Sequence, residues 1–145
     1  MDRIDMKSNT ITHLVAIPYP GRGHINPMMN LCKLLSSRKN DLLIIFVVTE
    51  EWLGFIGSCV KPDNIQFAAI PNVLPFELVR DADFPGFYEA VMTKMEAPCE
   101  ELLDILELPK TATIVDTELK WAICMGNRWN CPVNSFTLKE MNLYI

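Results

Sequence analysis

A chain of 145 residues provides enough sequence for about one domain, because domains run to ~100–200 residues. Half of the residues are hydrophobic, 21% are charged and the formal net charge is −5. This balance excludes a disordered chain and argues against a nucleic-acid binder. The longest apolar run, Leu42–Val48, is far shorter than the ~20 residues of a membrane-spanning helix, and the polar opening MDRIDMKSNT lacks a signal-peptide pattern. We therefore expect a soluble, cytoplasmic protein.

Apolar segments that alternate with helical patterns dominate the chain. Strands are predicted at Thr12–Pro18, Leu42–Thr49, Ile65–Ile70, Ala112–Thr117 and Pro132–Thr137. Nearly continuous apolar strands separated by helices are typical of a parallel sheet that is covered on both faces. The predicted fold class is therefore α/β, with a doubly wound, Rossmann-like parallel sheet.

The first helix has a recognisable start, because Asn26 can cap it and Pro27 suits the first helical position. Basic residues at Arg38 and Lys39 are expected to close its last turn. Further helices are predicted at Phe84–Leu106, kinked or split by Pro98, and at Glu118–Trp129, with a loop at residues 71–83.

The cysteines point away from disulfides and zinc. There are five of them, an odd number, and no two have CxxC spacing. The two histidines, His13 and His24, lie far from any cysteine pair, so we expect no metal site. Cys32 and Cys124 fall in apolar helical patterns, where a free cysteine usually packs as a small hydrophobic residue.

The loop after the first strand carries the first candidate chemistry. Gly21 and Gly23 flank Arg22 and permit close approach of a ligand, and His24 follows directly. Histidine can accept a proton from a hydroxyl group near neutral pH. The other interpretations are that His24 only hydrogen-bonds a turn and that the glycines only serve turn geometry.

Asp116 ends the fourth predicted strand, and the carboxyl ends of parallel strands meet at one edge of a sheet. Asp116 and His24 can therefore form the pair of base and orienting carboxylate known from hydrolases. The alternative is that Asp116 caps the next helix. No Gly-x-Ser-x-Gly elbow is present, so the pair favours activation of a substrate hydroxyl over activation of a protein nucleophile.

A dinucleotide fingerprint is the rival interpretation of Gly21-x-Gly23. That motif requires a third glycine at the position of Asn26, and Glu50 near the second strand is only a weak match to its acidic residue. An oxidoreductase domain that binds a dinucleotide remains an alternative. A further alternative is a non-catalytic module that binds a small molecule or a partner protein.

The segment HLVAIPYPGRGHINPMMNLCKLL resembles the amino-terminal signature of plant UDP-glycosyltransferases, and PYPGRGHINPM is most similar to family 87, subfamily A. The segment TATIVDTELKWAICMGNRWNCPV resembles the same family's stretch around an aspartate that partners the catalytic base. Together the two matches extend over about residues 12 to 137.

The resemblance implies the amino-terminal, acceptor-binding half of a two-domain GT-B fold. It implies that His24 deprotonates the hydroxyl of a small lipophilic acceptor, such as a flavonoid or another phenolic, and that Asp116 orients His24. A UDP-sugar would be the co-substrate, and no metal or other cofactor is implied. Acceptor-binding residues are then expected at Gly21, Gly23, Tyr19 and Phe84, and Phe76 and Phe87 are further aromatic candidates. The alternative is that these aromatic side chains belong to the core, which is more common for aromatic residues at such spacing.

The resemblance fails at the carboxyl end. The family's donor-binding motif does not occur after Thr137, and Leu138-Lys139-Glu140 replaces the expected tryptophan and pocket-lining helix. We therefore expect a disordered tail at residues 1–11, an acceptor-binding domain at 12–137 and a divergent, truncated tail at 138–145. This arrangement predicts poor or no sugar transfer by these residues alone and an uncovered sheet face to which a partner can dock.

Overall fold

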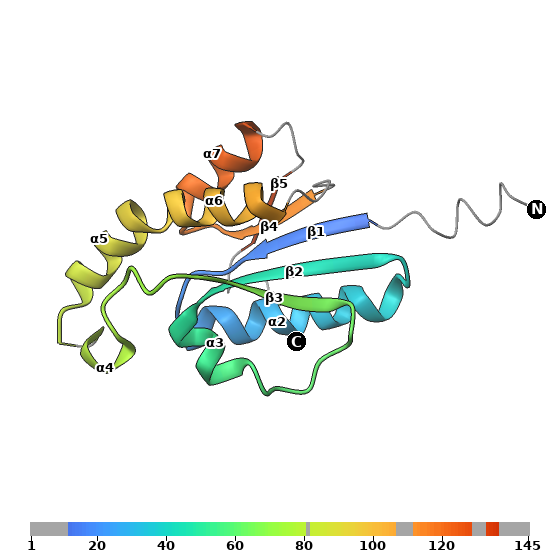
Figure 1. Cartoon of the computed structure of the whole chain (residues 1–145), viewed down its shortest axis with the longest axis horizontal. Helices are drawn as coiled ribbons and strands as arrows, with labels where there is room; N and C mark the ends of the chain where they lie inside the picture. The colour runs from blue at the N-terminus through green and yellow to red at the C-terminus, as the bar shows by residue number, and fades with distance from the viewer. Residues whose placement is uncertain (1–11, 81, 107–111, 129–132, 137–145) are drawn as a thin grey trace, which may run out of the picture.

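The computed structural model describes residues 12–80, 82–106, 112–128 and 133–136. Its centre is a parallel sheet with the strand order β3-β2-β1-β4-β5 (Figure 1). The strands are β1 (Thr12–Ile17), β2 (Leu42–Thr49), β3 (Ile65–Ile70), β4 (Ala112–Asp116) and β5 (Val133–Phe136). The predicted α/β class and all five predicted strands are confirmed over the described residues, each to within one residue at either end.

Helices cover both faces of the sheet. They are α2 (Arg22–Arg38), α3 (Glu50–Ile56), α4 (Glu77–Arg80), α5 (Phe84–Lys94), α6 (Glu96–Leu106) and α7 (Lys120–Arg128). In Figure 1, α2 and α3 lie below the sheet, α5, α6 and α7 lie above it, and α4 lies near its carboxyl edge. This arrangement is the doubly wound topology that the alternating pattern predicts.

Two apolar cores hold these layers together, one on each face of the sheet. On β1, Val15 and Ile17 contribute to the core under α5, α6 and α7, whereas Leu14 and Ala16 contribute to the core over α2 and α3. Successive side chains of a strand point to opposite faces, so a strand buried on both faces must be apolar at nearly every position. This is why the strands read as continuous apolar runs.

The expected start of the first helix is wrong. Helix α2 begins at Arg22 with Gly21 as its N-cap, and Pro27 lies inside the helix. The amide groups of His24 and Ile25 already donate to the Gly21 carbonyl, at 3.0 and 2.8 Å. Pro27 therefore removes one interior hydrogen bond instead of occupying the first position. As a consequence, His24 belongs to the first helical turn.

The predicted break in Phe84–Leu106 is confirmed, but it lies before Pro98. Helix α5 ends with Met95 as its C-cap, and α6 starts at Glu96. Pro98 thus falls in the first turn of α6, where its missing N–H leaves no intrahelical bond unmade. An interior proline would be costly, and a break three residues upstream avoids that cost.

The sequence patterns did not predict two short helices. Helix α3 follows β2 without a loop, because the Thr49 hydroxyl accepts from the Trp52 amide at 3.2 Å and caps it. Helix α4 lies inside residues 71–83, which were expected to be a loop. Helix α7 starts at Lys120, two residues later than predicted, and its predicted end at Trp129 lies outside the described residues.

The two predicted tails, residues 1–11 and 138–145, and the sheet face expected to be uncovered beyond Thr137 also lie outside the described residues. Among the helices that are described, none combines the length and the apolar character needed to cross a membrane.

The four cysteines that the structure describes divide into two classes with a testable difference. Cys32 and Cys99 are buried, and burial raises the pKa of each thiol to about 12. Cys59 and Cys124 are exposed, so the expectation that Cys124 packs as a core residue is wrong. The apolar stripe of α7 instead faces inward through neighbours such as Ala122 and Met125.

Because the thiolate is the reactive form, iodoacetamide at pH 8 is expected to alkylate Cys59 and Cys124 in the folded protein and to leave Cys32 and Cys99 unmodified. Peptide mapping by mass spectrometry measures this pattern. Labelling in denaturant is the control, because all five thiols of the chain should then react. Rapid labelling of Cys32 under native conditions would contradict the buried position of α2.

Candidate functional site

His24 and Asp116 meet at the carboxyl edge of the sheet, as predicted. Asp116 is the last residue of β4, and His24 lies in the first turn of α2, which follows β1. Strands β1 and β4 are neighbours, and the chain leaves them toward helices on opposite faces of the sheet. Such a point of divergence opens a crevice, which is where ligands bind in open parallel sheets.

The two side chains are joined by a hydrogen bond. His24 Nδ1 donates to Asp116 Oδ2 at 2.7 Å. An ionised carboxylate only accepts, so this contact places the imidazole proton on Nδ1 and leaves Nε2 as the acceptor. The His24 side chain is 27% exposed, whereas that of Asp116 is 4% exposed. His24 can therefore reach a ligand, whereas the carboxylate bonded to it is shielded from solvent.

Asp116 also fixes the turn that follows it. Its Oδ1 accepts from the Glu118 amide at 3.0 Å, and its backbone carbonyl accepts from the Leu119 amide at 2.9 Å. The two roles considered for this residue, partner of His24 and local cap, are therefore both present, one on each carboxylate oxygen. Both buried oxygens have partners, which offsets the desolvation of the carboxylate.

A pocket of about 290 Å³ opens beside His24. This volume is near the lower end of the ~300–1,000 Å³ of small-molecule sites. The residues that line it are Tyr19, His24, Arg80, Phe84, Tyr88 and Glu118. Three aromatic rings, one imidazole, one guanidinium and one carboxylate therefore surround a space suited to a small aromatic compound.

Tyr19 packs against both His24 and the aromatic wall of the pocket. Its ring lies 4.9 Å from the His24 ring and 6.4 Å from that of Tyr88, centroid to centroid. Burial raises the pKa of the Tyr19 phenol, and the nearby Arg80 charge only partly opposes this effect. The Tyr19 hydroxyl has no hydrogen-bond partner among the described residues. Tyr19 thus stays a neutral, rigid platform next to His24.

Of the other predicted ligand-binding residues, some line the pocket and some do not. Phe84 lines the pocket, as expected, whereas Phe87 is buried in the core and Phe76 is exposed outside the pocket lining. Gly21 packs against the Arg80 side chain, since a Cβ there would lie 2.8 Å from Arg80 Nη1. Gly23 has open space around it and does not line the pocket.

Arg80, Tyr88 and Glu118 were not predicted as site residues. Glu118 lies two residues after Asp116 in a tight turn, so its proximity could have been inferred from that spacing. Arg80 forms an ion pair with Glu77, with 3.1 Å between Nη1 and Oε1. The two residues are three positions apart, and this spacing is typical of ion pairs on a helix. No local pattern indicates that Arg80 or Tyr88 lines the pocket beside His24.

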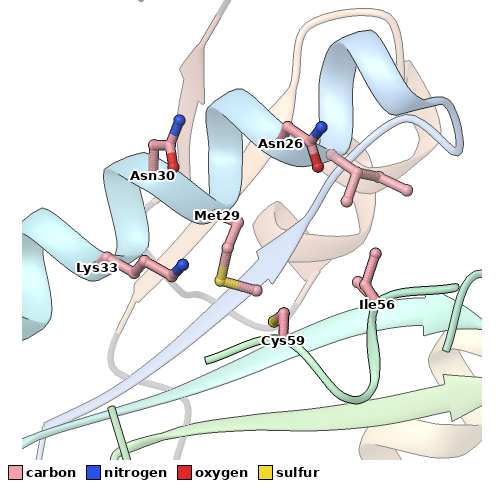
Figure 2. A pocket seen from close by; sticks show the side chains of 7 residues that line it. Asn26, Met29, Asn30, Lys33, Ile56 and Cys59 are labelled. Atoms are coloured by element: carbon pink, nitrogen blue, oxygen red, sulfur yellow. The ribbon is translucent and has the colours of Figure 1, made fainter. Parts of the chain in front are cut away.

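A second, smaller pocket of about 110 Å³ lies on the face of the sheet that α2 covers. Figure 2 shows Met29, Asn30 and Lys33 projecting from α2, with Ile56 and Cys59 opposite them. Its lining contains no histidine or carboxylate. Within the parts of the chain that the structure describes, no group of three or more potential ligand side chains could hold a metal ion.

Comparison with known proteins shows which proteins the chain resembles. UDP-glycosyltransferase 87A2 of Arabidopsis thaliana is 54% identical to the chain over 136 residues, which cover 93% of the chain and 30% of that relative. UDP-glycosyltransferase 87A1 of Arabidopsis thaliana is 58% identical over 120 residues, covering 83% and 27%, respectively. Over most of its length, the chain is therefore similar to plant UDP-glycosyltransferases. No protein-family model matches it.

The solved structure of a UDP-glucose: anthocyanidin 3-O-glucosyltransferase in complex with UDP has the same fold over most of the chain. The TM-score is 0.70 at 18% identity, and the match covers 89% of this chain and 30% of that one. The described domain is thus the amino-terminal half of a GT-B fold, as predicted. The chain spans about 30% of the length of the UDP-glycosyltransferases that it matches.

Proposed function

We propose that this domain binds the acceptor of a UDP-glycosyltransferase reaction and activates its hydroxyl group through His24. The observation that carries the proposal is the 2.7 Å contact between His24 Nδ1 and Asp116 Oδ2 at the wall of an aromatic pocket. This contact leaves Nε2 as the proton acceptor next to the space in which an acceptor would lie.

In the proposed reaction, Nε2 of His24 takes the proton of the acceptor hydroxyl, and Asp116 stabilises the imidazolium that forms. The acceptor oxygen bonds to the anomeric carbon of the UDP-sugar while the bond from that carbon to the phosphate oxygen breaks. The electron pair leaves with UDP. Attack from the side opposite the leaving group inverts the anomeric configuration. We propose glucose as the sugar, because the solved relative is named as acting with UDP-glucose.

The acceptor that we propose is a small lipophilic alcohol or phenol, of which flavonoids are one class. Tyr19, Phe84 and Tyr88 offer ring faces against which an aromatic acceptor can pack. The structurally similar protein is named as an anthocyanidin 3-O-glucosyltransferase. The proposal of an oxidoreductase domain lacks comparable support, since Asn26 occupies the third glycine position of a dinucleotide fingerprint.

The 145 residues by themselves are expected to bind acceptors and to transfer no sugar. A base accelerates transfer only when donor and acceptor are held in line, and this positioning supplies much of an enzyme's rate enhancement. Incubation of the chain with UDP-glucose and a panel of phenols, followed by mass spectrometry, should therefore yield no glucoside. Turnover by the isolated chain that disappears in His24→Ala would contradict this expectation.

A chimeric enzyme tests whether this domain supports sugar transfer when the rest of the enzyme is supplied. These 145 residues would replace the matching segment of UDP-glycosyltransferase 87A2, which supplies the remaining length. The chimera is expected to form β-glucosides from UDP-glucose, which NMR of the anomeric proton would identify. An α-linked product would exclude the inverting mechanism. A folded chimera that forms no glucoside with any phenol would argue against the proposed function.

A further inference from the structure

Arg80 is a cation in the wall of the pocket that contains His24, and contacts on several sides fix the position of its side chain. Its Cζ lies 5.1 Å from the centre of the Phe87 ring and 5.8 Å from that of Phe84. Its guanidinium group lies against Gly21 in the loop that leads to His24. The α4 segment that carries Arg80 is itself tethered, because the Glu77 amide donates to the Glu51 carboxylate at 2.9 Å.

This arrangement leaves Arg80 with capacity for a ligand. A guanidinium group has five N–H donors, and Glu77 Oε1 accepts from Nη1 at 3.1 Å. Stacking on aromatic rings engages the face of the guanidinium group and leaves the donors in its plane. The side chain is 19% exposed and lines the pocket that contains His24. A ligand oxygen in the pocket can therefore accept from Arg80.

We propose that Arg80 determines acceptor specificity by donating a hydrogen bond to a neutral carbonyl oxygen of an aromatic acceptor whose hydroxyl group faces His24. This inference rests on the proposed function and adds the substrate class: hydroxylated aromatic ketones. The aromatic rings of the pocket hold the hydrocarbon frame, His24 receives the reacting hydroxyl, and Arg80 fixes the other polar end. An acceptor without the carbonyl keeps the stacking contacts and loses this polar contact.

The charges around the pocket favour a neutral carbonyl over a carboxylate. Glu77 pairs with Arg80, Glu118 lines the pocket, and Asp116 is bonded to the pocket residue His24, so three carboxylates already lie in or next to the wall of this pocket. A ligand carboxylate would add a fourth negative charge to a partly desolvated space, where like charges repel strongly. A carbonyl oxygen accepts the same hydrogen bond without this repulsion.

Binding of three para-substituted phenols to the 145-residue chain tests the inference. The probes are 4-hydroxyacetophenone, which has the ketone, 4-ethylphenol, which has a similar size without the carbonyl, and 4-hydroxybenzoate, which has a carboxylate. Dissociation constants would come from NMR titration. The expected result is that the ketone binds about 10-fold more tightly than 4-ethylphenol, as a hydrogen bond to a charged group predicts. The carboxylate should bind more weakly than the ketone.

Substitutions of Arg80 distinguish a hydrogen bond to the ligand from simple packing in the pocket wall. Arg80→Met keeps an unbranched side chain and should bind the two neutral phenols equally, with the affinity for 4-ethylphenol unchanged within about twofold. Arg80→Lys should retain part of the preference for the ketone. Arg128→Met is the matched control, because Arg128 pairs with Glu96 and Glu100 on an exposed helix surface and does not line the pocket. Circular dichroism would verify the fold of each variant.

The outcomes distinguish this inference from the proposed function. Equal affinities of the unaltered chain for ketone and ethylphenol would overturn the inference while acceptor binding stands. An equal loss of both affinities in Arg80→Met would do the same, because it would assign Arg80 to packing. Tightest binding of 4-hydroxybenzoate would refute the charge argument. Failure of all three phenols to bind the folded chain would overturn the proposed function and the inference together.

Discussion

His24→Ala is expected to lower the kcat of the chimeric enzyme by about 10²–10⁴-fold, the usual contribution of a positioned general base. The KM for the acceptor should change little, because the aromatic walls formed by Tyr19, Phe84 and Tyr88 remain. Steady-state kinetics with UDP-glucose and a phenol that the chimera uses would measure both constants. Retention of more than a tenth of the kcat would exclude His24 as the base.

Asp116→Asn should produce a loss of kcat of about 10²-fold or more, because an amide can offer its N–H₂ to Nδ1 and so favour the wrong imidazole tautomer. The contact to the Glu118 amide can still be made by the remaining oxygen, so the fold should persist. His13→Asn is the matched control, since His13 is the other histidine of the chain and lies on β1 away from its carboxyl end. Its kcat should stay within about twofold of the unaltered chimera.

Phe46→Ala is expected to destabilise the 145-residue chain by about 3–5 kcal/mol. Phe46 is completely buried on β2, and its ring meets that of Phe67 edge to face with a centroid distance of 6.0 Å. Truncation removes this contact and leaves a cavity between the sheet and its covering helices. For a domain of this size, the loss corresponds to a decrease in Tm of roughly 10–15 °C. Differential scanning calorimetry would measure it.

Phe55→Ala is the matched control for Phe46→Ala, because it makes the same truncation at an exposed position. Phe55 is 53% exposed on α3, and its described ring contact is with Trp52 at 5.1 Å. The expected loss of stability is less than about 1 kcal/mol, since partial exposure leaves less transfer free energy to lose and no closed cavity. Equal effects of the two substitutions would contradict the positions of β2 and α3 in the fold.

The strands could be predicted from the sequence because burial on both faces imposes a continuous apolar run such as Leu42–Thr49. The short helices could not be predicted, because α3 and α4 are too brief to show a helical period. The start of α2 was misplaced for a different reason. A proline usually marks the first helical position, but here tertiary packing retains Pro27 inside the helix and glycine serves as the cap.

The contact between His24 and Asp116 could be predicted because the two residues follow neighbouring strands, and topology brings such positions together. The rest of the pocket depends on how α4 and α5 pack over the carboxyl edge. Arg80 reaches the pocket only because Glu51 anchors the start of α4 and Gly21 leaves room for the guanidinium group. These contacts join residues that are distant in the sequence and leave no periodic signal. Composition around Arg80 accordingly indicated a loop.

The position of β1 between β2 and β4 has a consequence for synthesis of the protein. Thr12–Ile17 pairs early with Leu42–Thr49, but its other neighbour, Ala112–Asp116, emerges roughly a hundred residues later. At ~5–20 residues per second, translation leaves one edge of β1 unpaired for roughly 5–20 s. During this interval, the nascent chain exposes an apolar strand edge that invites aggregation or chaperone binding. The closing of that edge by β4 also brings Asp116 to His24, so the proposed catalytic pair forms only when β4 has joined the sheet.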